Sequence, residues 1–164
     1  LTVVAAGKMI EQGMDAETIA EKLRAGTSRR HASFILDTLT FLSAGGRCSS
    51  VTAFGANMLK LKPCIQVDNH DGSMTVGKKY RGSLDKVLVK YVKDELARYS
   101  DINTDLLFIT HSGIPQDYID LVKKTVEDTI TFKEIHITKA SCTISCHCGP
   151  NTLGILFESN SSSI

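Results

Sequence analysis

The sequence predicts an α/β domain in which a mixed sheet, containing a β-hairpin, is flanked by helices. Segments with apolar residues at helical spacing alternate with short apolar runs that are typical of buried strands. Asp71-Gly72 lies between two extended runs and predicts a hairpin, which argues against a purely parallel sheet. The 164 residues, 42% hydrophobic and 23% charged, are enough to form one ordinary core.

The first part of the chain predicts two helices. Residues 3–12 have a helical pattern, which ends at Gly13. Asp15 is a favourable N-cap for a second helix, which is expected to run to about Arg24. Because the first helix begins without a cap, we expect the chain to be a piece of a longer protein.

A strand and two helices are expected next. Residues 31–36 form a short apolar run, which predicts a strand. Residues 37–46 predict a short helix that is capped by Asp37 or Thr38 and stopped by two glycines. Residues 49–60 predict another helix, with a serine as its cap.

The rest of the chain contains the clearest helix and the remaining strands. Two extended runs fill residues 61–80, and a helix capped by Ser83 follows. This helix has Lys and Asp on one face and an apolar stripe on the other, made of Leu84, Val87, Leu88, Tyr91, Val92, Leu96 and Tyr99. The later elements are strands at 105–110, 133–138 and 152–158 and a helix near Pro115 with Tyr118, Leu121, Val122 and Val126 on its apolar face.

The composition excludes several classes of protein. Neither repeats nor a linker interrupt the pattern, so we expect one domain over residues 1–158 and a polar tail over 159–164. The net charge of +1 argues against a nucleic-acid partner. No apolar run reaches the roughly 18 residues of a membrane span, and no signal peptide is recognisable. The odd number of cysteines, 5, favours a reducing compartment, and we expect a cytoplasmic protein.

Two arginines stand beside glycines and predicted helix starts. In "LSAGGRCSSV" (42–51), Arg47 precedes a helix N-terminus, where a cation is unfavourable unless an anion also binds there. Arg81 repeats this layout in "KKYRGS". The alternatives are that Arg47 turns into solvent or pairs with a carboxylate, and that Arg81 belongs to an exposed basic strand end with Lys78 and Lys79.

His147 lies in the cysteine-rich segment "CTISCHCGP". The Gly149-Pro150 turn restrains the backbone and gives the imidazole a fixed direction, although a structural hydrogen bond is an equally good explanation. The cysteine spacing is not a standard zinc motif, so we expect no metal site. One alternative remains open: Cys146 or Cys148 could act with His147 as a thiol–imidazole pair in a small-molecule enzyme.

Several of these segments together resemble the DegV family of bacterial fatty-acid-binding proteins. The first is "LDTLTFLSAGGR", which is similar to the family pattern DTLxYLxxGGR. It is followed by "LKP", where the family has IKP, and by a hairpin that ends in Arg-Gly. The closing "HCGPNTLGILF" is similar to HxGPGxLGxxF, with Asn151 in place of a glycine. The resemblance covers nearly the whole chain.

The resemblance implies that the chain is the C-terminal domain of a two-domain protein with the family's EDD fold. The N-terminal domain, which holds the lipid carboxylate in the family, is expected to be absent from this chain. Family members present a long-chain fatty acid to a separate kinase, which phosphorylates its carboxyl group for phospholipid synthesis. The resemblance therefore implies a carrier rather than an enzyme, with the fatty acid as its ligand, no other cofactor, and transient contact with membranes.

The resemblance also implies where the site lies. Arg47, Arg81 and His147 match family residues at the lipid head group or the kinase docking surface. We expect Gly45, Gly46, Gly149 and Pro150 to form the supporting turns, and Phe54 and Met58 either to line the acyl slot or to be plain core. A protein-interaction scaffold without lipid is the other alternative. It would predict that the basic residues contact only protein.

Overall fold

A computed structural model describes residues 1–45 and 61–161 of the chain. It contains a six-stranded sheet in the order β3-β2-β1-β6-β4-β5. Only β4 and β5 are parallel, while the other neighbouring pairs are antiparallel. The strands are β1 (Arg30–Ile35), β2 (Leu61–Val67), β3 (Met74–Arg81), β4 (Ile102–His111), β5 (Glu134–Lys139) and β6 (Leu153–Ser159). The predicted mixed α/β fold with a hairpin is therefore confirmed.

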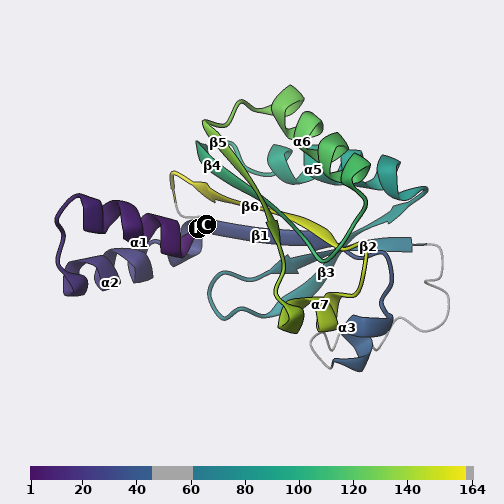
Figure 1. Ribbon diagram of the computed structural model, residues 1–164, viewed down its shortest axis with the longest axis horizontal. Helices are drawn as coiled ribbons and strands as arrows, with labels where there is room; N and C mark the ends of the chain where they lie inside the picture. The colour runs from purple at the N-terminus through teal and green to yellow at the C-terminus, as the bar shows by residue number, and fades with distance from the viewer. Residues whose placement is uncertain (46–60, 162–164) are drawn as a thin grey trace.

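The helices lie on both faces of the sheet and at one end of the molecule (Figure 1). Helices α5 and α6 cover one face, which we call the core face, and the short helices α3 and α7 lie on the other, which we call the open face. Helices α1 and α2 form an arm that projects from the body. The bounds are α1 (Thr2–Glu11), α2 (Ala16–Ala25), the 3₁₀ turn η1 (Thr27–Arg29), α3 (Thr40–Ala44), α5 (Leu84–Ala97), α6 (Gln116–Thr129) and α7 (Cys142–Cys148).

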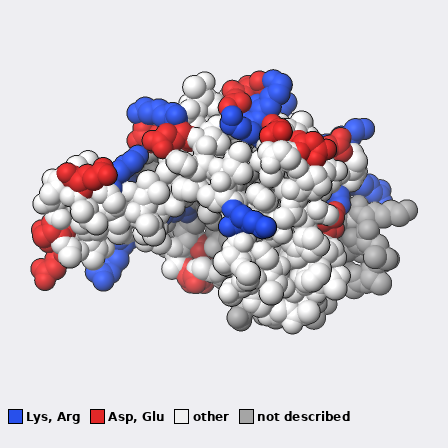
Figure 2. All heavy atoms as spheres, viewed as in Figure 1, with Lys and Arg blue, Asp and Glu red and all other residues white. Residues whose placement is uncertain are grey.

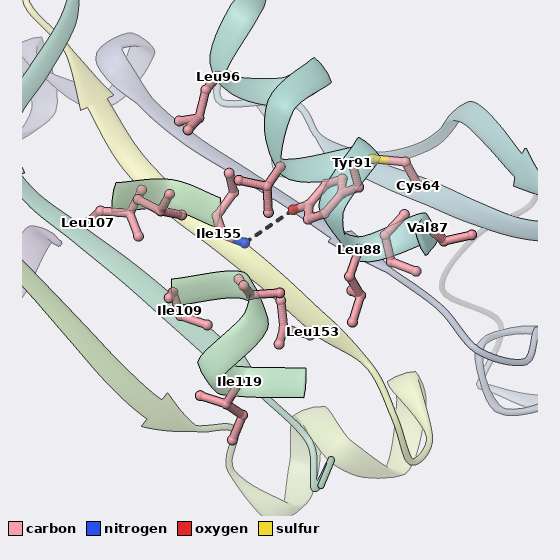
Figure 3. Close-up of a cluster of buried hydrophobic side chains, with 14 of the residues drawn as sticks. Cys64, Val87, Leu88, Tyr91, Leu96, Leu107, Ile109, Ile119, Leu153 and Ile155 are labelled. Atoms are coloured by element: carbon pink, nitrogen blue, oxygen red, sulfur yellow. Dashed lines mark hydrogen bonds between the residues drawn. The ribbon is translucent and has the colours of Figure 1, made fainter. Parts of the chain in front are cut away.

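The main core lies between the sheet and the apolar stripes of α5 and α6. The predicted stripe of α5 is buried except for Tyr99, which lies beyond the end of the helix. From the sheet, alternate residues of each strand point into this core, as the pleat requires. They include Ile35 and Phe157. Figure 3 shows four others, Leu107, Ile109, Leu153 and Ile155.

Tyr91 joins α5 to the middle of the sheet. Its hydroxyl donates to the carbonyl oxygen of Ser33 at 2.7 Å and accepts from the backbone N–H of Ile155 at 3.1 Å (Figure 3). Because the phenol has a single proton, the 2.9 Å bond with Ser33 Oγ must have the serine as donor. Burial raises the pKa of Tyr91 well above its usual range. The helix is thus fastened to β1 and β6 through one side chain.

A smaller apolar cluster lies on the open face. It consists of Leu36, Leu42, Ile65 and Cys148, and it packs α3 and α7 against the ends of β1 and β2. Phe34, Leu39, Met74 and Val76 pack against this cluster and are only partly buried. The open face is therefore apolar beyond the area that α3 and α7 cover.

Several sequence signals have the predicted local structure. The side chain of Asp15 accepts from the backbone N–H of Thr18 at 2.9 Å and caps α2. Thr38, one of two expected caps, accepts from Thr40 N at 3.3 Å at the start of α3. The hairpin turn contains Gly72 with φ +75°, a conformation that glycine adopts without strain.

Other details differ from the prediction. The α5 helix ends at Ala97 rather than near Tyr99, and Ser83 occupies its N-cap position without a capping side-chain bond. The sequence did not predict α7 at all, although Ser141 caps it by accepting from Ile144 N at 3.3 Å. The predicted helix at 49–60 lies outside the described residues.

The helices of the described residues are short or amphipathic. Over residues 1–45 and 61–161, none of them has the length and the apolar character that a bilayer span requires.

Candidate functional site

The candidate site begins where α3 and α7 meet on the open face. The imidazole of His147 lies against Gly45, the residue that follows α3: a Cβ built on Gly45 would be 2.2 Å from His147 Nδ1. A Cβ built on Gly149 would be 2.4 Å from the ring of Phe41 in α3. The two glycines therefore allow two close crossing contacts. Gly45 and the "HCGP" segment, about 100 residues apart in the sequence, therefore meet in space.

The turn after α7 is held from several sides. Gly149 ends the helix with φ +77°. Thr152 Oγ1 donates to the carbonyl oxygen of Cys148 at 2.9 Å, and the backbone N–H of Asn151 donates to Gly113 O at 3.0 Å. Ser112 Oγ donates to Gly149 O. These bonds fix the backbone that carries His147 to the end of β4.

Asp37 connects three segments beside this turn. Its carboxylate accepts from Lys62 Nζ in β2 and from Asn151 Nδ2, the latter at 3.0 Å. Burial alone would raise the pKa of Asp37, but the bonds from Lys62 and Asn151 outweigh burial and lower it. Asp37 is therefore ionised at neutral pH and ties the end of β1 to β2 and to the turn.

Asn151 combines two properties at this position. Its φ is +58°, which Asn tolerates better than most residues. Its side chain adds the bond to Asp37, which a glycine at the same position would lack. The departure from the family pattern at Asn151 thus adds a contact.

Arg81 lies at the same end of the sheet as His147. It is the last residue of β3 and is paired with Leu61 at the start of β2. Its neighbour Tyr80 points into the main core, so Arg81 points to the open face, where α7 lies. The side chain of Arg81 is exposed. Two of the three predicted head-group residues thus share one face and one end of the sheet.

The remaining predicted site residues divide into two groups. Arg47, Gly46, Phe54 and Met58 lie outside the described residues. Pro150 is exposed and follows the buried Gly149 in the turn that carries His147.

The surface around α7 is largely uncharged. Figure 2 shows Lys, Arg, Asp and Glu gathered over α6 and on the α1–α2 arm, whereas the atoms over α7 are mostly white. Ile144 in α7 is 52% exposed and Phe41 in α3 is 40% exposed. Ile144 and Phe41 therefore give the described part of this surface two exposed apolar side chains.

Of the cysteines in the described part of the chain, Cys148 lacks the properties of an activated nucleophile. Cys148 is buried, and burial raises the pKa of its thiol, whereas a nucleophilic thiol requires a lowered pKa. Cys142 and Cys146 are exposed on α7. Across residues 1–45 and 61–161, no three His, Cys, Asp or Glu side chains lie close enough together to hold a metal ion.

An apolar strip runs along the open face away from His147. Leu36 lies under α3 and α7, Phe34 is next along β1, and Ala32 follows at the edge of a hollow of about 490 Å³. That hollow lies between the sheet and the arm, and Leu23, Val67 and Leu156 provide further apolar wall. At about 3.3 Å per residue, Ala32 and Leu36 are roughly 13 Å apart along the strand.

Sequence reasoning missed Asp37, Lys62 and Ser112 as parts of this site. Asp37 was considered only as a helix cap, and Lys62 only as part of the "LKP" segment. Their roles depend on which strands are neighbours in the sheet, and no local pattern contains that information. The joint occurrence of these segments in the resemblance was the one available signal.

Comparison with known proteins identifies the family. The family model described as "Uncharacterised protein, DegV family" matches residues 1–160. The chain belongs to the DegV family. The chain spans about half the length of the curated DegV relatives it matches, 55% in one case and 52% in another.

Individual DegV relatives agree with this placement. A protein of Thermotoga maritima described as "Fatty acid-binding protein" is 27% identical over 156 residues, which are 93% of this chain and 52% of the relative. A DegV protein of Eubacterium eligens loaded with heptadecanoic acid has a similar fold, with a TM-score of 0.83 at 21% identity over 97% of this chain and 56% of its own. The fatty acid kinase (Fak) B3 protein of Streptococcus pneumoniae, loaded with linoleic acid, gives a TM-score of 0.81 at 19% identity over 97% of this chain and 55% of its own.

Proposed function

We propose that this chain is the C-terminal half of a cytoplasmic carrier that holds a long-chain fatty acid and presents its carboxylate to a separate kinase. The acyl chain would lie along the open face of the sheet, and its carboxylate would lie near His147. In this proposal the carrier itself performs no bond-making step, and the kinase supplies nucleotide and metal.

The observation that carries the proposal is the apolar strip on the open face. It joins the hollow beside Ala32 and Leu156 to the cluster beneath α3 and α7, next to His147. Burying an acyl chain is worth about 0.8 kcal/mol per CH₂, so a long chain gains several kcal/mol from an apolar strip of this kind.

The head group requires polar partners at one end of that strip. An ionised carboxylate cannot be buried without hydrogen bonds or opposite charge. We assign His147, Arg81 and Arg47 to this task, with Gly45 and Gly149 providing the space for the imidazole and Phe41. Arg81 is exposed and remains accessible to a carboxylate, an incoming phosphate or an acidic kinase surface.

The printed descriptions of the relatives support this assignment. Three of the similar proteins are described with a fatty acid or as fatty-acid-binding, and one of them is named as a protein of a fatty acid kinase. The proposal extends their shared property to this chain.

Mass spectrometry of organic extracts tests the proposal. We expect the purified full-length protein, which contains both halves, to release a long-chain fatty acid in a ratio near one per protein. An extract without fatty acid from protein expressed in lipid-containing cells would contradict the carrier and favour a scaffold.

Variants at the head group test the site. His147→Ala is expected to lower acyl phosphate formation with the kinase by at least tenfold, whereas His136→Ala, an exposed histidine on β5 bonded to Glu134, is the matched control. If both variants form acyl phosphate at the unaltered rate, the assignment of His147 is wrong.

A further inference from the structure

We propose that a second site, on the core face of the sheet, binds a small molecule through a primary ammonium group. It is a hollow of about 300 Å³ whose walls include Gln66, Asp68, Asn69, Glu95, Arg98 and Tyr99. We call it the polar hollow. It lies at the end of the sheet opposite to His147.

The polar hollow exists because two neighbouring strands diverge. β1 begins at Arg30, but its pairing with β2 extends only from Ile35↔Cys64 to Ser33↔Gln66. The first half of β1 therefore lies apart from the end of β2. Asn69 bridges the gap by donating to Ser28 O and to His31 Nδ1, both at 3.3 Å.

A buried carboxylate lies in the wall of the hollow. Glu95 lies within the otherwise apolar buried stripe of α5 and is only 4% exposed. It accepts from Gln66 Nε2 at 3.0 Å and from Arg98 Nη1 at 3.3 Å. Its second oxygen, Oε2, accepts only the long 3.3 Å bond from Arg98 among the residues that the structure describes. Burying a carboxylate is costly unless its oxygens are well satisfied, so Oε2 is a favourable point for a donor.

The amide side chains around Glu95 have used their donors. Gln66 must turn its NH₂ group to the carboxylate of Glu95, and Asn69 must turn its NH₂ group to the carbonyl oxygen of Ser28, because both partners are acceptors. This fixes the orientation of each amide without ambiguity between nitrogen and oxygen.

Several acceptor oxygens in the polar hollow receive no hydrogen bond from the described residues. In the described ranges, no hydrogen bond reaches Gln66 Oε1, Asn69 Oδ1 or Asp68 Oδ2, while Asp68 Oδ1 accepts from His70 N at 2.7 Å. The positive charge of Arg98 is balanced by Glu95, so Asp68 leaves the lining with a negative charge. The ring of Tyr99 already has two neighbours, because the ring of His31 lies 4.0 Å from it and the guanidinium of Arg98 lies over it at 5.7 Å.

These properties define the ligand class. An ammonium group brings three N–H donors and a positive charge, which match the open acceptors and the net negative lining. A carboxylate or phosphate ligand would be repelled by these acceptor oxygens and by the negative charge of Asp68. The volume is suited to a small aliphatic amine.

Titration of the isotope-labelled protein with ethanolamine, followed by nuclear magnetic resonance, tests the site. We expect saturable shifts of the side-chain amide signals of Gln66 and Asn69. Choline has the same charge but no N–H donor, and we expect it to bind at least tenfold more weakly. Equal binding of choline and ethanolamine, or no saturable shift with ethanolamine, would overturn the proposal.

Three variants locate the binding. Glu95→Gln keeps the size of the side chain and is expected to weaken ethanolamine binding about tenfold. If this buried variant fails to fold, Asp68→Asn replaces it as the test, because Asp68 is exposed. Asp71→Asn in the same hairpin lies outside the hollow and is expected to bind normally. Asp68 also lines the other hollow, which lies on the open face beside the arm. The fatty-acid content of each variant is therefore measured in parallel. We expect it to remain unchanged for Glu95→Gln. Equal weakening by Asp71→Asn would show only a general charge effect and contradict the site.

Discussion

At the scale of single residues, the site depends on two glycines, which leave space for neighbouring side chains because they have none of their own. Gly45 carries no Cβ, and the imidazole of His147 fills that space. Gly149 does the same for Phe41 and also adopts a positive φ of +77°. The sequence predicts that both glycines support turns, but which side chain each one admits follows only from the fold.

Gly45→Ala tests the contact with His147. The new Cβ would fall 2.2 Å from Nδ1, so the imidazole must move, while the backbone of Gly45 needs no positive φ. We expect acyl phosphate formation to fall about tenfold, with a loss in the free energy of unfolding of only about 1 kcal/mol, because the atom displaced is at the end of a side chain. Gly7→Ala, which meets nothing within 4 Å, is the control. Unaltered acyl phosphate formation by Gly45→Ala would contradict the role given to this contact.

Asn151→Gly tests the bond to Asp37. Glycine keeps the positive φ but removes the 3.0 Å hydrogen bond, so we expect a loss of about 1 kcal/mol in the free energy of unfolding at neutral pH. Urea denaturation of both proteins measures the difference. An Asn151→Gly protein as stable as the unaltered one would show that this bond contributes nothing.

The pH dependence of stability tests the charge of Asp37. The folded state lowers the pKa of Asp37, so the carboxylate stabilises the protein above the ordinary value of about 3.9 and loses that contribution as the pH falls through the lower, folded value. The difference in unfolding free energy between the unaltered protein and Asp37→Asn should therefore be largest near neutral pH and shrink below about pH 4. A difference that is independent of pH would contradict an ionised Asp37.

At the scale of elements, Tyr91 shows where pattern reasoning stops. The spacing of apolar residues predicted α5 and placed Tyr91 on its buried face, which the structure confirms. That pattern treats tyrosine as an apolar residue and contains nothing about its hydroxyl group. The bonds to Ser33 and Ile155 depend on β1 and β6 being neighbours, and that is a property of the sheet.

Tyr91→Phe is expected to lower the free energy of unfolding by about 3 kcal/mol. It leaves the N–H of Ile155 and the carbonyl of Ser33 buried without their partner, and each such group costs about 1–3 kcal/mol. Tyr99→Phe is the matched control, because that hydroxyl bonds to no residue in the described part of the chain, and we expect a change within about 0.5 kcal/mol. Equal losses in the two variants would contradict the role of the buried hydroxyl.

Helix α7 is the element that the sequence did not predict. Its seven residues, "CTISCHC", contain three cysteines and two β-branched residues and have no clear apolar stripe. Tertiary contacts with α3 and the Ser141 cap stabilise it instead. Because α7 carries His147, the surroundings of His147 could not be predicted from the sequence either.

At the scale of the whole molecule, the two faces of the sheet are covered by different helices. The core face is covered by α5 and α6, whereas among residues 1–45 and 61–161 the helices on the open face, α3 and α7, lie at one end of the sheet (Figure 1). The fold class and most elements followed from periodicity, since strong stripes and an Asp-Gly turn are local signals. The apolar strip was not predicted, because it combines residues from strands that are distant in sequence.

Photocrosslinking with diazirine fatty acids tests most directly whether the acyl chain lies on the open face. A diazirine near the last carbon should label peptides that contain Ala32 or Leu156, and one near the carboxylate should label α7 around His147. Labels on the surface of α5 and α6, or the same label pattern for both probes, would contradict an acyl chain that runs along the open face to His147.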